Sequence, residues 1–435
     1  MNKVIFGAAF VLALLVGHLL RDTPGYMVRG ADGSLSGDIT HYVYWTRLVT
    51  LGGIQSAYSG TWPETYAVYP PLTLLPLEVV GTVYQHTQDP TFDVDRAQAS
   101  VWLHEAIKFT ALTWHLLTGL AIYTLLRGTR GAIAASVYLL NPAALYDVAH
   151  WAQPDGAQSL FSVLAVGLLD LGQVVAPWAS IAAAAMAKPQ AWFLAPLLLI
   201  ATFRSHGVRG VGRGLVAAGA VTLLISLPFI LTGHLRDLVG LPLAVSTVMP
   251  VVSADAHNFW WLVLQQRGQD PIFLQDSARL VGPLSYRIAA AALVAVSVVL
   301  VCWLYWTRRA NLAEAAALGV LGWFTFTTQA HENHLFLALP LLSLAWPVRH
   351  SLLVPLAVVS LTLLLNMVLH DQLVLESLGL GVDDQLVVRL RLMNAMLNVG
   401  CFVAWSAWAS TRKAQTLPVD QHQPLGYSEL VAVHD

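Results

Sequence analysis

Long apolar runs separated by short polar connections dominate this chain, and they predict helices that cross a membrane. A helix needs about 20 apolar residues to cross the hydrocarbon of a bilayer. Such runs lie at residues 3–20, 106–126, 131–149, 156–175, 214–232, 283–306, 312–330, 351–370 and 389–410. Shorter runs at 178–187, 190–203 and 335–346 can cross where other helices shield them from lipid. We therefore expect an all-α polytopic integral membrane protein with about 12 transmembrane helices.

The same pattern divides the chain into four parts. These are a first transmembrane helix (1–20), a large first loop (21–105), a multi-helix core (106–411) that includes a second long loop (233–282), and a tail (412–435). The first run is followed by Arg21-Asp22-Thr23-Pro24, which is not a small-residue signal cleavage site, so we interpret it as an anchoring helix. The tail is polar and lacks periodicity from residue 415 onward, and we expect it to be disordered.

Basic residues predict the orientation of the bundle. They fall in alternate short connections that hold almost no acidic residues, at Arg127 and Arg130, Arg204, Arg209 and Arg213, Arg308 and Arg309, Arg349, and Arg412 with Lys413. Cytoplasmic loops of membrane proteins are enriched in lysine and arginine. Both termini are therefore expected in the cytoplasm, and the loops 21–105 and 233–282 outside a plasma membrane.

Composition agrees with this class and excludes others. Of 435 residues, 56% are hydrophobic and only 11% are charged, whereas a soluble domain carries about a quarter charged residues. A net charge of −2 gives no sign of nucleic-acid binding. Cys302 and Cys401 both fall in apolar runs, so neither a disulfide framework nor a cysteine metal site is expected.

Asp38 is the leading catalytic candidate, because it follows the first apolar run at the predicted outer membrane surface. A carboxylate placed there can take a proton from a substrate hydroxyl. The alternative is that Asp38 only caps an interfacial helix over 39–51, since aspartate is a favoured N-cap residue. Tyr69 precedes Pro70-Pro71 and an apolar run over 73–84, where the prolines favour the start of a helix lying on the membrane.

Other polar residues are predicted to reach the same outer face. The segment after Asn141 carries Asp147, His150, Trp151, Gln153 and Asp155, a cluster that indicates a polar cavity, although one tryptophan alone would be ordinary interfacial anchoring. Lys188 lies between two apolar runs, with Gln190 after it, and either snorkels to the interface or binds a phosphate.

Imidazoles complete this set of candidates. His257, Asn258 and Trp260 lie in one loop, and His331, Glu332 and His334 in another. The second group differs in spacing from the His-Glu-x-x-His of zinc proteases, so contact with phosphate or hydroxyl groups is favoured over a metal. We predict neither a metal nor a cofactor.

Several short motifs occur in an order that resembles a known family. They are Gly37-Asp38, Tyr69-Pro70-Pro71-Leu72-Thr73, Pro142-Ala143-Ala144-Leu145 followed by Asp147, His150 and Gln153, Lys188-x-Gln190, Asn258-Phe259-Trp260, and His331-Glu332. This order resembles the dolichyl-phosphate-glucose dependent α-glucosyltransferases of N-glycan precursor assembly. The resemblance implies the GT-C fold, an inverting glycosyltransferase that uses a polyprenyl-phosphate-sugar donor, and Asp38 as its general base.

Four lysines against nineteen arginines in a single compact chain point to a prokaryotic relative with a different acceptor, and two positions depart from the family pattern. Asn333 follows the His-Glu pair where eukaryotic members commonly have lysine, and Pro189 interrupts the Lys188 motif. The expected partners are the polyprenyl-phosphate-sugar donor, a lipid-linked or envelope glycan acceptor and membrane lipids, with no nucleic acid. In the mechanism that fits, Lys188, His331, His334 and His257 contact the donor phosphate, while Trp151 or Trp260 stacks on a sugar. Glucose and mannose remain open as the sugar, and a secondary transporter or a lipid-glycan flippase is the rival class.

Overall fold

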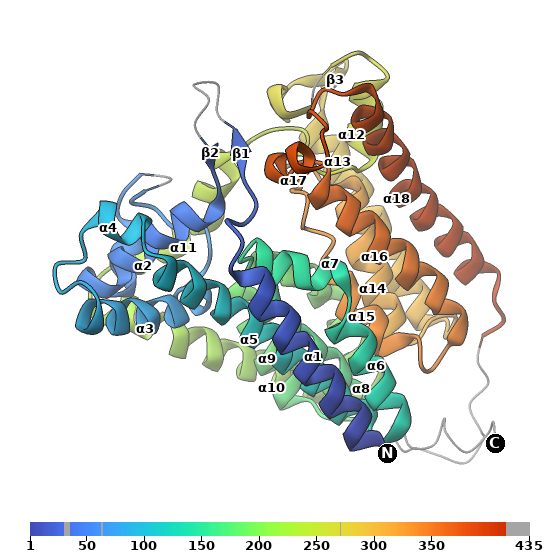
Figure 1. Ribbon diagram of the computed structural model, residues 1–435. Helices are drawn as coiled ribbons and strands as arrows, with labels where there is room; N and C mark the ends of the chain where they lie inside the picture. The colour runs from blue at the N-terminus through green and yellow to red at the C-terminus, as the bar shows by residue number, and fades with distance from the viewer. Residues whose placement is uncertain (30–34, 62–63, 270, 415–435) are drawn as a thin grey trace.

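The protein is almost entirely helical (Figure 1). The computed structural model describes residues 1–29, 35–61, 64–269 and 271–414. Within them the α-helices are α1 (Asn2–Arg21), α2 (Asp38–Gly52), α3 (Pro71–Thr87), α4 (Val94–Gln98), α5 (Val101–Leu126), α6 (Gly128–Leu139), α7 (Pro142–Leu145), α8 (Asp155–Asp170), α9 (Val175–Ala187), α10 (Ala195–Leu231), α11 (Leu235–Val248), α12 (Phe259–Gln265), α13 (Tyr286–Trp306), α14 (Leu312–Phe326), α15 (Ala338–Ala345), α16 (Leu353–Val368), α17 (Gln372–Ser377) and α18 (Gln385–Thr411).

Short helical turns and strands join these helices. The 3-10 turns are η1 (Ile54–Tyr58), η3 (Pro189–Leu194), η4 (Pro271–Phe273) and η5 (His350–Leu352), and η2 (Tyr146–His150) is a π-helical turn. The strands β1 (Val28–Arg29) and β2 (Leu35–Ser36) pair antiparallel, as do β3 (Arg279–Val281) and β4 (Leu284–Ser285). The expected disorder of residues 415–435 lies outside the described residues.

Six helical segments in the described part of the chain are long and apolar enough to cross a membrane. They are Asn2–Arg21, Val101–Leu126, Pro189–Leu231, Tyr286–Trp306, His350–Val368 and Gln385–Thr411. A seventh span is possible if α6 and the segment Pro142–His150 count together, although they are bent by 51°. The apolar helices α9 and α14 are shorter, at 13 and 15 residues.

The expected count of about twelve crossings is therefore not reached by helices of sufficient length. The apolar run at 131–149 breaks at Asn141, whose side chain caps α7 by accepting hydrogen bonds from the backbone N–H groups of Ala143 and Ala144. The runs at 190–203 and 214–232 both lie in α10, but its backbone is non-helical at Gly207, with a φ of +63° and a ψ of −167°, so two helices meet there as the separate runs predict. An apolar run predicts where the chain is buried or faces lipid, but such breaks depend on single residues.

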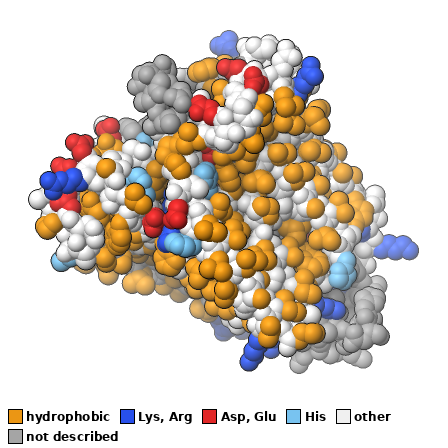
Figure 2. All heavy atoms as spheres, in the orientation of Figure 1, with side chains coloured by type: hydrophobic (Ala, Val, Ile, Leu, Met, Phe, Trp, Pro, Cys, Tyr) orange, Lys and Arg blue, Asp and Glu red, His pale blue; other side chains and the backbone are white. Residues whose placement is uncertain are grey.

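The outer surface of the bundle is suited to lipid. Figure 2 shows hydrophobic side chains over much of its visible face, with charged groups gathered toward the ends and on the side that carries α2 to α4. On α10, for instance, Val216 and Leu231 are 74% and 75% exposed. Exposure of large apolar side chains along a helix is costly in water and favourable in hydrocarbon. The protein is thus an integral membrane protein.

The helices α2, α3, α4 and α11 lie together at one side of the bundle (Figure 1) and share a separate hydrophobic core. Ile39 and Val43 of α2, Leu74 and Leu77 of α3 and Leu241 of α11 are buried there. The first loop is therefore a packed unit that places the beginning of α2 against the bundle.

Candidate active site

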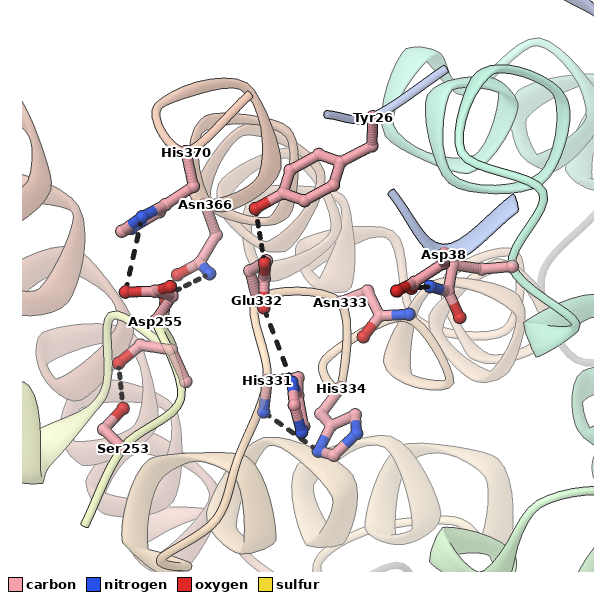
Figure 3. Close-up of polar contacts among 12 residues, drawn as sticks. Tyr26, Asp38, Ser253, Asp255, His331, Glu332, Asn333, His334, Asn366 and His370 are labelled. Atoms are coloured by element: carbon pink, nitrogen blue, oxygen red, sulfur yellow. Dashed lines mark hydrogen bonds and ion pairs between the residues drawn. The ribbon is translucent and has the colours of Figure 1, made fainter. Parts of the chain in front are cut away.

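Segments far apart in the sequence meet where this outer unit joins the bundle. The beginning of α2, the turn between η2 and α8, the end of α9 and the segment before α15 contribute polar side chains, and Figure 3 shows part of this group. Gly37 makes the close contact between the start of α2 and the segment of Tyr26 possible, because a Cβ atom at this position would collide with the carbonyl oxygen of Tyr26. The small residue lets the backbone before Asp38 lie directly against the segment that carries Tyr26.

Asp38 is half-buried and is the first residue of α2. The indole Nε1 of Trp151 donates a hydrogen bond to its Oδ2 at 3.1 Å, and the side-chain amide of Gln153 donates to the same oxygen at 2.5 Å. The N-cap of α2 is Gly37, and no side-chain bond caps this helix end. The side chain of Asp38 therefore contacts the turn after η2, and the capping role considered from the sequence is not what it performs.

Gln153 is itself held in one orientation. Its Oε1 accepts hydrogen bonds from the hydroxyls of Tyr42 at 3.2 Å and Tyr69 at 3.0 Å. Because hydroxyl donors fix the carbonyl end, the amide N–H group must face Asp38. Two tyrosines from the outer unit thus orient the glutamine that holds the candidate base.

The electrostatic surroundings of Asp38 suit proton transfer. Burial raises the pKa of this carboxyl above its usual range, while His41 and the hydrogen bonds from Gln153 and Trp151 act in the opposite direction. A carboxylate with a raised pKa is a better proton acceptor than a free aspartate at the same pH.

Lys188 forms a buried ion pair, with its Nζ 2.7 Å from Oδ2 of Asp155 and only 1% of the residue exposed. Asn333 donates to the same carboxylate oxygen at 2.9 Å, and Gln158 donates to Oδ1 at 2.6 Å. Lys188 also lies 5.5 Å from the centre of the Tyr69 ring. A buried cation needs this degree of pairing to offset its loss of water.

Two features place Lys188 where it is. It follows the last residue of α9, Ala187, whose carbonyl accepts a 2.7 Å hydrogen bond from the hydroxyl of Thr73 on α3. Asp147 of η2 is fully buried and lies within electrostatic range of both Lys188 and Asp155. Of the two alternatives considered for Lys188, snorkelling to water is not what the side chain does, since it turns into the protein.

Glu332 is a second carboxyl group of the site, connected to Asp38 by two aromatic rings. The hydroxyl of Tyr26 donates to its Oε1 at 2.6 Å (Figure 3). The Tyr26 ring stacks on Trp151 with 4.0 Å between ring centres, and Trp151 in turn donates to Asp38. Burial, and then the charge of Asp255, raise the pKa of Glu332 to about 8.

His331 and His334 lie beside Glu332 but have different environments. The backbone N–H of His331 donates to Nδ1 of His334 at 3.1 Å, so that ring nitrogen carries no proton. Nε2 of His334 lies 3.0 Å from the side-chain amide of Gln190. The side chain of His331 is 38% exposed and its Nδ1 is 3.8 Å from Glu332, which makes it the more accessible imidazole.

The three side chains of this segment do not form a metal site. Within the described residues, no group of three or more histidine, cysteine, aspartate or glutamate side chains is arranged to hold a metal ion. The hydrogen bonds of His334 explain this locally, because both of its ring nitrogens face protein groups.

Four other predicted residues have structural partners. His150 bridges Thr23, at 2.6 Å, and Asp371, at 2.9 Å. His257 is fully buried, Asn258 caps α12 by accepting from the N–H groups of its first turn, and Trp260 is 1% exposed and donates to the carbonyl of Phe326. The rings of His257 and Trp260 are enclosed and bonded to protein groups, so the contacts that the structure gives them are structural.

Several residues of the site were not predicted from the sequence. Tyr26, Tyr42, Asn333 and Asp255 all contact or face predicted residues. Asp255 stands two positions before His257, in a loop whose polar groups the sequence already places on the outer face. Tyr26 carries no such signal, since its partner Glu332 lies 306 positions further along the chain.

Fold and site together define an all-α polytopic membrane protein with a polar site where an outer helical unit meets the bundle. No family of known proteins matches this chain, and no curated protein matches its sequence. Among solved structures, the chain is similar to the crystal structure of ArnT from Cupriavidus metallidurans bound to undecaprenyl phosphate. That likeness has a TM-score of 0.50 at 15% sequence identity and covers 93% of this chain and 76% of that chain. The fold is therefore of the GT-C type, as the sequence motifs predicted.

Proposed function

We propose that the protein is an inverting glycosyltransferase that moves a hexose from a polyprenyl-phosphate-sugar donor to a lipid-linked or envelope glycan, with Asp38 as general base. The observation that carries this proposal is the Asp38 carboxylate, half-buried at the start of α2 and held by Trp151 and Gln153. The GT-C fold supports it, since the similar ArnT structure holds undecaprenyl phosphate. The hexose is glucose or mannose, and the motifs do not separate the two.

The chemistry is a direct displacement at the anomeric carbon of the donor. Asp38 takes the proton of the acceptor hydroxyl as its oxygen attacks this carbon, and the bond from carbon to the phosphate oxygen breaks. Polyprenyl phosphate leaves as a monoester, which is stable at neutral pH, so the leaving oxygen needs charge stabilisation more than a strong acid. The products are the extended glycan, the lipid phosphate and a proton on Asp38.

Lys188 and His331 are the proposed contacts of the donor phosphate. Lys188 supplies the positive charge, and His331 is the exposed imidazole next to it in the site. Nε2 of His334 faces Gln190, so a phosphate would have to replace that amide to reach this ring, whereas His257 is left out because its ring is enclosed. Preorganised donors around a developing charge are a main source of catalysis in such sites.

The helix α3 offers a surface for the polyprenyl chain. Leu75, Val79 and Val83 are spaced by four residues, so they share one face, and their exposed fractions are 40%, 65% and 43%. Thr73 at the beginning of the same helix is bonded to Ala187, next to Lys188. A lipid lying along this face would bring its phosphate toward the site.

The test is sugar transfer by the purified protein. Radiolabelled polyprenyl-phosphate-glucose and polyprenyl-phosphate-mannose are supplied separately, with a lipid extract of the native host as the acceptor. Label should enter a new product with one donor. Asp38→Asn should lower the rate by about 10²–10⁴-fold while leaving the thermal unfolding temperature unchanged.

The matched control is Asp237→Asn on α11, an exposed aspartate whose partner is His234. It should keep full activity. Turnover of Asp38→Asn near that of the control would remove Asp38 as the base. Absence of transfer from both donors would count against the hexosyltransferase, and transport by proteoliposomes would then favour the rival class.

A further inference from the structure

A buried pair of histidines beside the site has its protons fixed by its neighbours. Nδ2 of Asn394 donates to the carbonyl oxygen of Thr362 at 2.9 Å, so this end of the amide is the nitrogen. The same nitrogen lies 2.9 Å from Nδ1 of His257, which must therefore accept. The neutral His257 ring then carries its proton on Nε2, which faces Nε2 of His370 at 2.9 Å.

This proton placement makes Nδ1 of His370 an N–H donor that faces the carboxylate of Asp255. Because Nε2 of His370 accepts from His257, the proton of its neutral ring is on Nδ1, 3.4 Å from Oδ1 of Asp255. Burial, and then Arg391, hold the pKa of both histidines well below the usual range, so both stay neutral. Figure 3 shows His370 and Asn366 next to each other above Asp255, and the amide of Asn366 donates to the backbone carbonyl of Asp255 at 3.1 Å.

Glu332 lies next to the carboxylate that this pair fixes. Glu332 is 6% exposed, and its Oε1 accepts the hydroxyl proton of Tyr26. The titratable groups that face it are Tyr26 before β1, Asp38 on α2, Asp255 and the adjacent His331. Burial is the main cause of the raised pKa of Glu332, and the two carboxylates add to it, because a third negative charge beside them would be unfavourable.

We propose that Glu332 acts as an uncharged hydrogen-bond donor to a phosphate oxygen of the lipid donor, and that Asp255, positioned by His370, keeps it protonated. Because Tyr26 donates to Oε1, the acid proton is on Oε2, the oxygen on the side of the exposed His331. A neutral acid donates to an oxyanion, whereas a carboxylate would repel it. This inference rests on the proposed function, since it assumes a polyprenyl phosphate as ligand.

The experiment compares variants that keep or remove the proposed hydrogen-bond donor at position 332. The dissociation constant of a sugar-free polyprenyl phosphate is measured in detergent between pH 6 and 9 for the wild type, Glu332→Gln, Glu332→Ala and Asp255→Asn. Ionisation of the ligand is common to all four, so differences between them report on the protein. Asp237→Asn is the control and should bind as the wild type does.

Glutamine mimics the protonated acid, so Glu332→Gln should bind as tightly as the wild type at pH 6 and should not weaken as the pH passes about 8. Glu332→Ala should bind about tenfold more weakly at pH 6. In Asp255→Asn, loss of the neighbouring charge lowers the pKa of Glu332, so binding should weaken at a lower pH than in the wild type.

Three results would overturn the proposal. Glu332→Gln binding as weakly as Glu332→Ala would show that the ionised form is the one required. An unchanged pH midpoint in Asp255→Asn would remove Asp255 as the group that keeps Glu332 protonated. A wild type that does not bind the lipid phosphate would overturn the proposed function as well, which separates that failure from the other two.

Discussion

Each ionisable residue of the site is held by hydrogen bonds or an ion pair to specific neighbours. Asp38 receives two N–H donors on one oxygen, Glu332 receives the hydroxyl of Tyr26, and Lys188 is paired with Asp155. The Lys188 pair has a consequence for binding, because its ammonium already has a carboxylate partner. A donor phosphate must therefore share the lysine with Asp155. The contribution of Lys188 to folding stability has to be separated by experiment from its contribution to phosphate binding.

A pair of substitutions makes that separation. Lys188→Met leaves Asp155 as a buried, uncompensated carboxylate and should lower the free energy of unfolding by about 3–5 kcal/mol, along with the affinity for polyprenyl phosphate. Adding Asp155→Asn removes the unpaired charge and should restore much of the stability, as measured by chemical denaturation in detergent. Affinity should stay low in the double variant. Recovery of both quantities together would mean that Lys188 only supports the fold.

Individual helices show what the sequence could and could not predict. The interfacial helix expected at 39–51 is α2, and the apolar run at 73–84 lies within α3, because proline and glycine mark their beginnings. The break at Asn141 was missed, since an apolar run continues across it, whereas the break at Gly207 falls in the basic connection expected between the runs 190–203 and 214–232. Bonds such as Tyr26 to Glu332 could not be predicted either, because nothing in the local sequence relates positions 306 apart.

The beginning of α2 is the element on which the proposed catalysis depends most. Gly37→Ala would push a Cβ atom into the carbonyl of Tyr26, so the segment has to move and Asp38 with it. We expect turnover to fall about 100-fold, the effect of a displacement near 1 Å, with the thermal unfolding temperature little changed. Gly7→Ala in α1 is the matched control, because no atom lies within 4 Å of the added Cβ. Equal activity of the two variants would contradict a tight placement of Asp38.

At the scale of the whole molecule, the site and the arginines around Glu314 lie toward opposite ends of the bundle. Glu314 binds Arg349 and Arg412 at one end, and Thr129 of α6 bonds to Asn2 near the N-terminus. In Figure 1 the N-terminus lies at the bottom, whereas β1 and α17 lie in the upper part with the outer helices. Because lysine and arginine concentrate in cytoplasmic loops, we expect the upper end to face outward.

Cysteine labelling of intact cells tests this orientation. In a protein with Cys302→Ser and Cys401→Ser, a single cysteine is introduced by Ser377→Cys at the end of α17 or by Thr129→Cys at the start of α6, both exposed positions. A membrane-impermeant maleimide should label the first before lysis and the second only after it. The opposite pattern would place the site in the cytoplasm, where the donor and acceptor would have to be cytoplasmic too. Asp38 would then serve a reaction on the inner leaflet, and the outward assignment of the proposed function would be wrong while its chemistry could stand.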